Sequence, residues 1–391
     1  MGPSTTIYLA LPIGTRIYTL PERLSRLWYI ADVQWLRQKL GQMLMVGCQG
    51  ESLTRDEALA FEEYAFGGFI LFRQNCRSPE QISDLCRCLW TTAADEPPFL
   101  AIDHEGGRIH RLPEPFTHFP SAAVIGQSGN PEIAYQCGRA TAAELRVVGL
   151  NLDFAPVLDV NSNPASPIIG DRAFGRTPEQ VIEMSSAWMR GLRDGGVIPC
   201  GKHFPGHGDT ERDSHLELPL VEKSLDQLRK IELPPFANAC HTGIEALMTA
   251  HVRFTALDRE LPATLSEAVV TGMLRHQLGY DGVIFSDDME MKAISANFPP
   301  AEAAALALRA GVDVLLFCHE LTKAIEVFES LSTLAENDPA LQARIAGSFR
   351  RITGLKRRFL TAFTGSSGGE SLARLAAMNH QRILDRIYGS L

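Results

Sequence analysis

The stretch KHFPGHGDTERDSH, residues 202–215, holds three histidines, two aspartates and a glutamate beside two cationic side chains. Pro205, Gly206 and Gly208 interrupt it, so no regular helix or strand would run through it. Imidazole and carboxylate groups so close together could bind a metal ion or move protons, or they could form only a polar loop. The choice depends on which other polar residues the fold brings to the same place.

Polar side chains also follow other short apolar runs of the chain. Three of these runs lead into AIDHEGGRIHR, VLDVNSNPASPIIGDRAFGR and IFSDD, and a fourth ends at His251. In a parallel α/β barrel, the loops that follow the strands form one open face, and catalysis takes place there. A single polar loop residue is usually a cap or a solvated side chain, but repetition at several strand ends indicates one functional face.

Eight apolar runs, separated by amphipathic segments such as 131–148, give the chain an α/β alternation. The runs cover residues 42–47, 67–72, 98–103, 151–157, 197–204, 246–252, 282–287 and 312–317. Eight strands close a parallel barrel, so the pattern predicts a (β/α)8 TIM-type barrel. A doubly wound open sheet is the alternative, but no G-x-G-x-x-G fingerprint follows the first run.

Composition excludes several classes of protein. The 391 residues are 45% hydrophobic and 21% charged, and the formal net charge is -9 without a basic stripe, which argues against a nucleic-acid partner. No apolar run approaches the roughly 18 residues that a membrane span requires. The eight cysteines are scattered in apolar surroundings, as expected for reduced thiols that fill a core. The amino terminus has no cation before Arg16 and no cleavage signature, so we expect no export.

Three chemistries fit such a polar face. A metal hydrolase could use His203, His207, His215, His251 and Asp287, although the first run lacks the early histidine pair that such barrels need. A glycosidase needs a carboxylate near the anomeric carbon, a proton donor, and polar groups that grip hydroxyls, and the residues present suit it. A carbohydrate-binding barrel without catalysis would need the same grip.

The motifs KHFPGHGDTERDSH, GVIFSDDMEM, AIDHEGGRIHR, FAPVLDV and IIGDRAFG together resemble the β-N-acetylglucosaminidases of glycoside hydrolase family 3, which include muropeptide-recycling enzymes. The resemblance extends from about residue 36 to about 360. It implies that Asp287 is the nucleophile, that His215 is the acid/base, and that Asp213 is the partner of His215. It further implies sugar-binding roles for Asp103, Arg111, Arg172, Lys202 and His203.

Physical chemistry is consistent with these roles. A retaining mechanism places the nucleophile roughly 5 Å from the proton donor. Imidazole, with an ordinary pKa of roughly 6.5, can cycle near neutral pH, and a carboxylate beside it stabilises its charged form. We expect Gly206 and Gly208 to let the loop carry His215 to the substrate.

Other polar residues at the strand ends have plainer interpretations. Asp159 and Asp171 are expected to accept hydrogen bonds from loop amides. Glu290 is expected to be a first-turn acid of the helix that follows it. For His207 a backbone cap, and for His251 either site lining or packing, are open alternatives.

We therefore predict a retaining exo-β-N-acetylglucosaminidase that acts on cytosolic cell-wall fragments of the N-acetylglucosaminyl-anhydromuramyl type. Phosphorolysis, a glucosidase or xylosidase activity, and more distantly a metal-dependent hydrolase are the alternatives. The expected protein needs no metal or cofactor, binds neither nucleic acid nor membrane, and acts as a cytoplasmic monomer. Residues 1–35 are predicted to be an extension, 36–363 the barrel, and 364–391 a helical tail beyond the breaker TGSSGG.

Overall fold

The computed structural model describes residues 34–93, 96–163, 166, 168–210, 214, 217–366 and 369–390, together with two short strands nearer the amino terminus. Those two strands, β1 (Thr6–Leu9) and β2 (Arg16–Thr19), pair antiparallel as a hairpin. Residues 34–41 are helical and lead into the first strand of the main fold.

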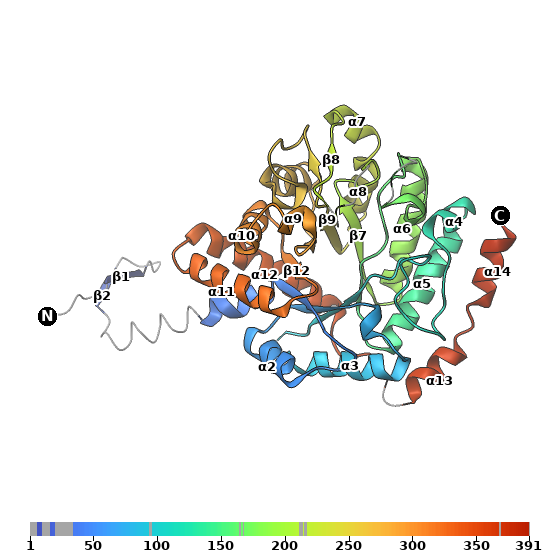
Figure 1. Cartoon of the computed structure of the whole chain (residues 1–391), viewed down its shortest axis with the longest axis horizontal. Helices are drawn as coiled ribbons and strands as arrows, with labels where there is room; N and C mark the ends of the chain where they lie inside the picture. The colour runs from blue at the N-terminus through green and yellow to red at the C-terminus, as the bar shows by residue number, and fades with distance from the viewer. Residues whose placement is uncertain are drawn as a thin grey trace.

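The centre of the fold is a closed barrel of parallel strands in the order β11-β12-β3-β4-β5-β6-β7-β9, ringed by helices (Figure 1). The strands are β3 (Leu44–Gly47), β4 (Gly68–Leu71), β5 (Phe99–Ile102), β6 (Leu152–Asp153), β7 (Ile198–Phe204), β9 (Ala246–Thr249), β11 (Val283–Asp288) and β12 (Val314–Phe317). All eight lie within or overlap the apolar runs, so the predicted TIM-type barrel is confirmed and the open sheet is excluded. Strands covered on both faces need such continuous apolar sequence.

The helices of the ring follow the strands in turn. They are α2 (Arg55–Tyr64), α3 (Pro79–Thr91), α4 (Ala122–Gln127), α5 (Pro131–Val147), α6 (Pro178–Asp194), α7 (Leu225–Lys230), α8 (Leu233–His241), the π-helix η4 (Ala268–Gln277), α9 (Lys292–Ser295), α10 (Pro300–Ala310), α11 (Leu321–Glu336) and α12 (Pro339–Phe359). Short additions are η1 (Arg73–Asn75), η2 (Gly170–Arg172), η3 (Ala263–Leu265) and the paired strands β8 (Leu220–Val221) and β10 (Arg253–Phe254).

Local sequence explains where the longer helices begin and how closely they pack. At α6, the Thr177 side chain accepts a hydrogen bond from the Gln180 amide and a proline occupies the first turn, which is a strong start signal. On α5, a Cβ at Gly138 would lie 2.4 Å from the Trp188 carbonyl oxygen of α6. Only glycine permits this close contact between the two helices.

The interior of the barrel is filled by aromatic side chains. Phe285 lies edge-on to Phe99 and to Phe154, with ring centroids 5.7 and 5.5 Å apart. Lys356 of α12 is fully buried, with its Nζ 4.9 Å from the Phe99 ring centroid and 2.6 Å from Gln42 Oε1. A buried lysine with an amide partner and no carboxylate partner has a low pKa, and burial lowers that of Lys356 to about 7.

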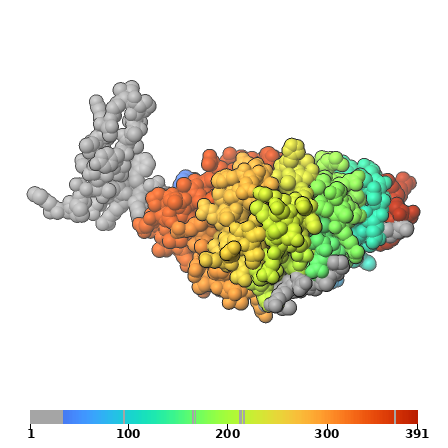
Figure 2. All heavy atoms as spheres, turned by 90° about the horizontal axis from the view of Figure 1, so that it is seen from above, coloured from blue at the N-terminus to red at the C-terminus, as the bar shows by residue number. Residues whose placement is uncertain are grey.

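The tail differs from the sequence prediction, which treats 370–391 as one amphipathic segment. It forms two helices, α13 (Glu370–Ala377) and α14 (Gln381–Gly389), because Met378 is extended and the Asn379 side chain accepts a hydrogen bond from the Gln381 amide. Both helices contact α5, and α13 also contacts α3. Figure 2 shows the tail, in red, beside the teal surface of the α4–α5 region.

No described helix combines the length and apolar character needed to cross a bilayer. The division into residues 1–35, 36–363 and 364–391 stays a prediction.

Candidate active site

A cavity of about 170 Å³ opens at the carboxyl ends of the barrel strands. Six residues predicted from the sequence line it: Asp103, Arg111, Arg172, Lys202, His203 and Asp287. A larger hollow of about 680 Å³ lies beside Glu245 and Arg351, but none of the predicted site residues lines it. The barrel therefore brings together the polar strand ends that the sequence singles out.

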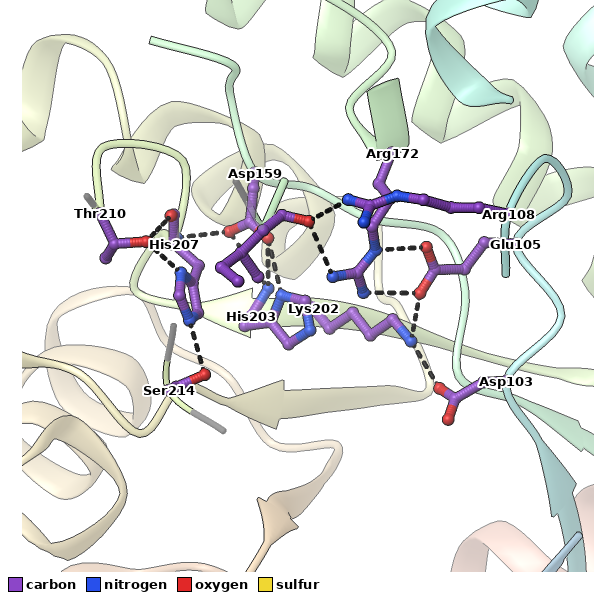
Figure 3. Close-up of polar contacts among 11 residues, drawn as sticks. Asp103, Glu105, Arg108, Asp159, Arg172, Lys202, His203, His207, Thr210 and Ser214 are labelled. Atoms are coloured by element: carbon purple, nitrogen blue, oxygen red, sulfur yellow. Dashed lines mark hydrogen bonds and ion pairs between the residues drawn. The ribbon is translucent and has the colours of Figure 1, made fainter. Parts of the chain in front are cut away.

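A buried ion network forms one wall of the cavity (Figure 3). The Lys202 Nζ lies 2.6 Å from Asp103 Oδ1 and 2.6 Å from Glu105 Oε1. The Arg172 guanidinium grips Glu105 with two hydrogen bonds of 2.8 Å. Glu105 is thus a bridge between the end of β7 and the η2 turn, and a bidentate arginine pair fixes its plane.

The network keeps Glu105 and Lys202 charged. Burial alone would raise the pKa of Glu105, but Arg172 and Lys202 outweigh it and hold that pKa well below its usual range. Burial alone would lower the pKa of Lys202, but Asp103 and Glu105 raise it. In a buried site the effective dielectric constant is lower than in water. Fixed charges and dipoles there bind hydroxyl groups more strongly than the same charges would in bulk water.

Asp159, at 0% exposure, supports the neighbouring histidine. Its Oδ2 lies 2.7 Å from His203 Nδ1, and its carboxylate also accepts the backbone amides of His203 and His207. Because a carboxylate only accepts, the proton of His203 is on Nδ1, and Nε2 is the nitrogen that can meet a ligand. The predicted loop-amide role of Asp159 is confirmed, and fixing the His203 ring is an additional one.

Two adjacent aspartates stand at the end of β11. The pairing register with β12 shifts between Phe285 and Asp288, and both Asp287 and Asp288 line the cavity instead of alternating across the sheet. Asp288 accepts amide hydrogen bonds from Glu290 and Cys318, so its carboxylate is tied to the backbone. Asp287 accepts only the amide of Asp288 among the described contacts, which leaves it available for chemistry.

The two carboxyl groups have different acidities. Burial alone would raise the pKa of Asp287, but His203, His251 and the Asp288 amide together lower it. Burial raises the pKa of Asp288 to about 6, although nearby amides and His319 oppose it. Both groups are thus mostly ionised at neutral pH, and Asp287 is the one that stays ionised when the pH falls below about 6.

The loop after β7 is held by His207, which is 1% exposed. Its Nδ1 lies 2.7 Å from Thr210 Oγ1 and its Nε2 lies 3.2 Å from Ser214 Oγ. The ring thus joins two points of the loop. Asp213 and His215, the predicted acid/base pair, lie outside the described residues.

Comparison with known proteins identifies the family. The "Glycosyl hydrolase family 3 N terminal domain" matches residues 35–355. The chain belongs to glycosyl hydrolase family 3.

Relatives in this family are similar over most of their length. A beta-hexosaminidase of Tolumonas auensis is 37% identical over 324 residues, which cover 80% of this chain and 94% of the relative. One of Methylococcus capsulatus is 38% identical over 343 residues, covering 87% and 96%.

Solved structures agree with the assignment. A family 3 beta-N-acetylglucosaminidase from Paenibacillus sp. str. FPU-7 superposes with a TM-score of 0.81 at 37% identity, covering 90% of this chain and 68% of that one. NagZ from Neisseria gonorrhoeae, solved in complex with N-trifluoroacetyl-D-glucosamine, gives a TM-score of 0.70 at 33% identity, covering 89% and 96%.

Three histidines at the strand ends of this family 3 barrel make hydrogen bonds that give them roles other than metal binding. His203 Nδ1 is held by Asp159, both ring nitrogens of His207 face hydroxyl groups, and those of His251 face Thr264 Oγ1 and the Asp288 carbonyl. Over the described residues, no three His, Cys, Asp or Glu side chains are arranged to hold a metal ion. His251 does not line the cavity, so packing against the strand end is the alternative that holds.

Three polar residues at the strand ends of this family 3 barrel have roles that the sequence interpretation missed or mistook. Glu105 is absent from the predicted site, although its position two residues after Asp103 was a signal. The sequence predicts that Glu290 is a first-turn acid of the helix that follows it, but it lies before α9, which begins at Lys292. Its carboxylate accepts the amides of His319 and Glu320, just before α11 begins. The sequence predicts that Asp171 accepts hydrogen bonds from loop amides. It instead forms an exposed ion pair with Arg108 at 3.1 Å and accepts no amide among the described contacts.

Proposed function

We propose that this chain is a retaining exo-β-N-acetylglucosaminidase. The observation that carries the proposal is the position of Asp287, a carboxylate with a lowered pKa at the end of β11, in the same cavity as the Lys202 network. A glycosidase needs this combination of an ionised carboxylate and a surrounding set of hydroxyl-binding groups. The beta-hexosaminidase relatives support the N-acetylhexosamine specificity.

In the first step, Asp287 attacks the anomeric carbon and forms a covalent glycosyl ester, while His215 donates a proton to the leaving oxygen. Asp213 orients the imidazole and stabilises its charged form. In the second step, His215 takes a proton from water, and the water oxygen displaces Asp287 with net retention of configuration.

The ring of the sugar is bound by the remaining predicted residues. Lys202 and Asp103, already joined at 2.6 Å, supply a donor and an acceptor that are oriented before the sugar arrives. Arg172 is fixed by Glu105, and His203 by Asp159, so each presents one preset face to a hydroxyl or amide group. Arg111 lines the same cavity and completes the set.

For the aglycone, we propose the anhydro-N-acetylmuramic acid end of cell-wall fragments, met by a monomeric enzyme in the cytoplasm. NagZ, one of the structural neighbours, was solved with an N-acylglucosamine analogue, which supports the sugar that is cleaved. The aglycone rests on the family resemblance alone.

The decisive experiment is to trap the intermediate. A slowly released, fluorinated N-acetylglucosaminide should leave a sugar on the peptide that contains Asp287, detected by peptide mass mapping, and Asp287→Asn should abolish labelling. A label on another residue would exclude Asp287 as the nucleophile. Release of sugar phosphate in phosphate buffer would point to phosphorolysis instead of hydrolysis.

A further inference from the structure

The loop that follows β5 carries four residues of the cavity wall, Asp103, Glu105, Ile109 and Arg111. Residues 117–120 support the turn of this loop, because the Gly107 amide donates a 2.9 Å hydrogen bond to the Phe119 carbonyl. A Cβ at Gly106 would lie 2.7 Å from the Pro120 carbonyl oxygen, so the two arms of the loop are in close contact. The position of residues 117–120 therefore affects where Glu105 and Arg111 lie.

Arg111 depends on this support more than its neighbours do. Lys202, Arg172 and Glu105 hold one another in place. The Arg111 Nε, in contrast, is buried with no hydrogen-bond partner among the described residues. The position of its guanidinium therefore depends on where the loop backbone places residue 111.

The returning arm of the loop is held by a residue of the C-terminal tail. His380, just before α14, places its Nδ1 3.0 Å from Glu144 Oε1 and 3.2 Å from Thr117 Oγ1. The same Glu144 carboxylate, buried on α5, accepts the Thr117 amide at 2.9 Å and the Thr117 hydroxyl at 2.5 Å. The His380 ring also lies nearly parallel to Phe119, with centroids 6.4 Å apart.

His380 is not the only residue that attaches the tail to the barrel. Other contacts do so: Arg386 donates to Gln136 of α5, Arg374 donates to Ser366, and Ser366 is in turn bonded to Ser83 and to the Val147 carbonyl. Replacing His380 should therefore leave the tail docked and change only what it does at Thr117 and Phe119.

We propose that His380 is a positioning residue for the sugar-binding loop, so that the tail, which lies beyond the residues matched by the family domain, sets the affinity of the site through Arg111. The contacts lead from His380 to Thr117 and Phe119. They continue through the Phe119 carbonyl to the Gly107 amide, and the loop backbone then joins Gly107 to Glu105 and Arg111. This inference rests on the proposed N-acetylglucosaminidase function.

The test compares full-length variants on an aryl N-acetylglucosaminide. His380→Ala should raise KM by about fivefold and change kcat by less than about twofold, the size expected for losing one hydrogen bond that aids binding. His380→Asn keeps a donor near Nδ1 and should recover part of the loss. Tyr388→Ala, on the exposed side of α14, is the matched control and should behave as wild type.

A double-mutant cycle separates positioning from general destabilisation. If His380 acts through Arg111, His380→Ala should add little to the KM of Arg111→Ala, whereas independent effects would multiply. Calorimetric titration with N-acetylglucosamine gives the same comparison without turnover. Equal KM for His380→Ala and Tyr388→Ala, or multiplicative effects in the cycle, would overturn the proposal. An inactive wild-type enzyme that does not bind N-acetylglucosamine would instead refute the proposed function.

Discussion

At the scale of single residues, the site is organised around a carboxylate that need not touch the sugar. Glu105 is 6% exposed and accepts from both Lys202 and Arg172. Sequence reasoning predicts the two cations but not their common partner, because the pairing crosses from the β5 loop to the end of β7 and to η2. Such a contact depends on barrel closure, which no local pattern encodes.

Replacing this bridge should damage both stability and binding. Glu105→Gln keeps the size of the side chain but leaves two buried cations short of charge, a change that costs roughly 3–5 kcal/mol. We expect a clear fall in melting temperature, measured by differential scanning fluorimetry, and a KM raised at least about tenfold.

Asp171→Asn is the control for that prediction. It breaks the Asp171–Arg108 pair, whose side chains are 50% and 47% exposed, and exposed pairs contribute roughly 0–1 kcal/mol. If both variants lost the same stability, burial would not be what makes Glu105 important.

At the scale of elements, the loop after β7 is fixed where it passes the loop after β6. A Cβ at Gly208 would lie 1.7 Å from the Val160 carbonyl oxygen, so this glycine is required by a close contact between two loops. Gly206 has a φ of +132°, a conformation that glycine adopts most readily. These are structural reasons for two glycines that the sequence suggests are hinges, and the loop movement itself stays a prediction.

Gly208→Ala should therefore displace the loop and lower both stability and kcat/KM, since a contact with backbone cannot be relieved by a rotamer change. The control is Gly354→Ala in α12, where nothing lies within 4 Å of the added Cβ. That change should stabilise by up to about 1 kcal/mol through helix propensity. Chemical denaturation should show a lower free energy of unfolding for Gly208→Ala and a higher one for Gly354→Ala. A stable, fully active Gly208→Ala enzyme would show that the close contact with Val160 is not required.

The same scale shows which parts of the fold can be predicted from sequence. The eight apolar runs mark the strands, since burial on both faces demands them. The run at 151–157 is a regular strand only over Leu152–Asp153. Beyond it, single backbone hydrogen bonds continue to β7, such as that from the Cys200 amide to the Ala155 carbonyl, but Pro156 has no amide to donate. The break in the tail at Met378 follows from a single Asn379 cap, which an amphipathic pattern does not reveal.

At the scale of the whole molecule, one buried charge links stability to pH. The pKa of Lys356 is lowered from 10.5 to about 7 by burial. Between those values the unfolded chain binds a proton that the folded chain does not, so stability rises as pH increases from about 7 towards 10.5. Below pH 7 both states are protonated, and the full cost of burying the ammonium remains.

Lys356→Met should consequently stabilise the protein by about 3 kcal/mol at pH 7, after allowing for the lost hydrogen bond to Gln42. The gain should shrink as pH approaches 10. Urea denaturation at several pH values measures it, with Lys292→Met, at an exposed position, as the matched control. A gain that is constant with pH would show that Lys356 is not buried as an ionisable group.

The ion network has a consequence for the kind of ligand that the barrel can select. Lys202 and Arg172 are balanced by Asp103 and Glu105, and the same cavity is lined by one further cation, Arg111, and two further carboxylates, Asp287 and Asp288. The opposite charges of these residues thus nearly cancel, with one carboxylate in excess, and the net field that the cavity presents to an approaching molecule is weak. Recognition then depends on the directions of donors and acceptors, so the site suits an uncharged sugar ring and is little affected by ionic strength.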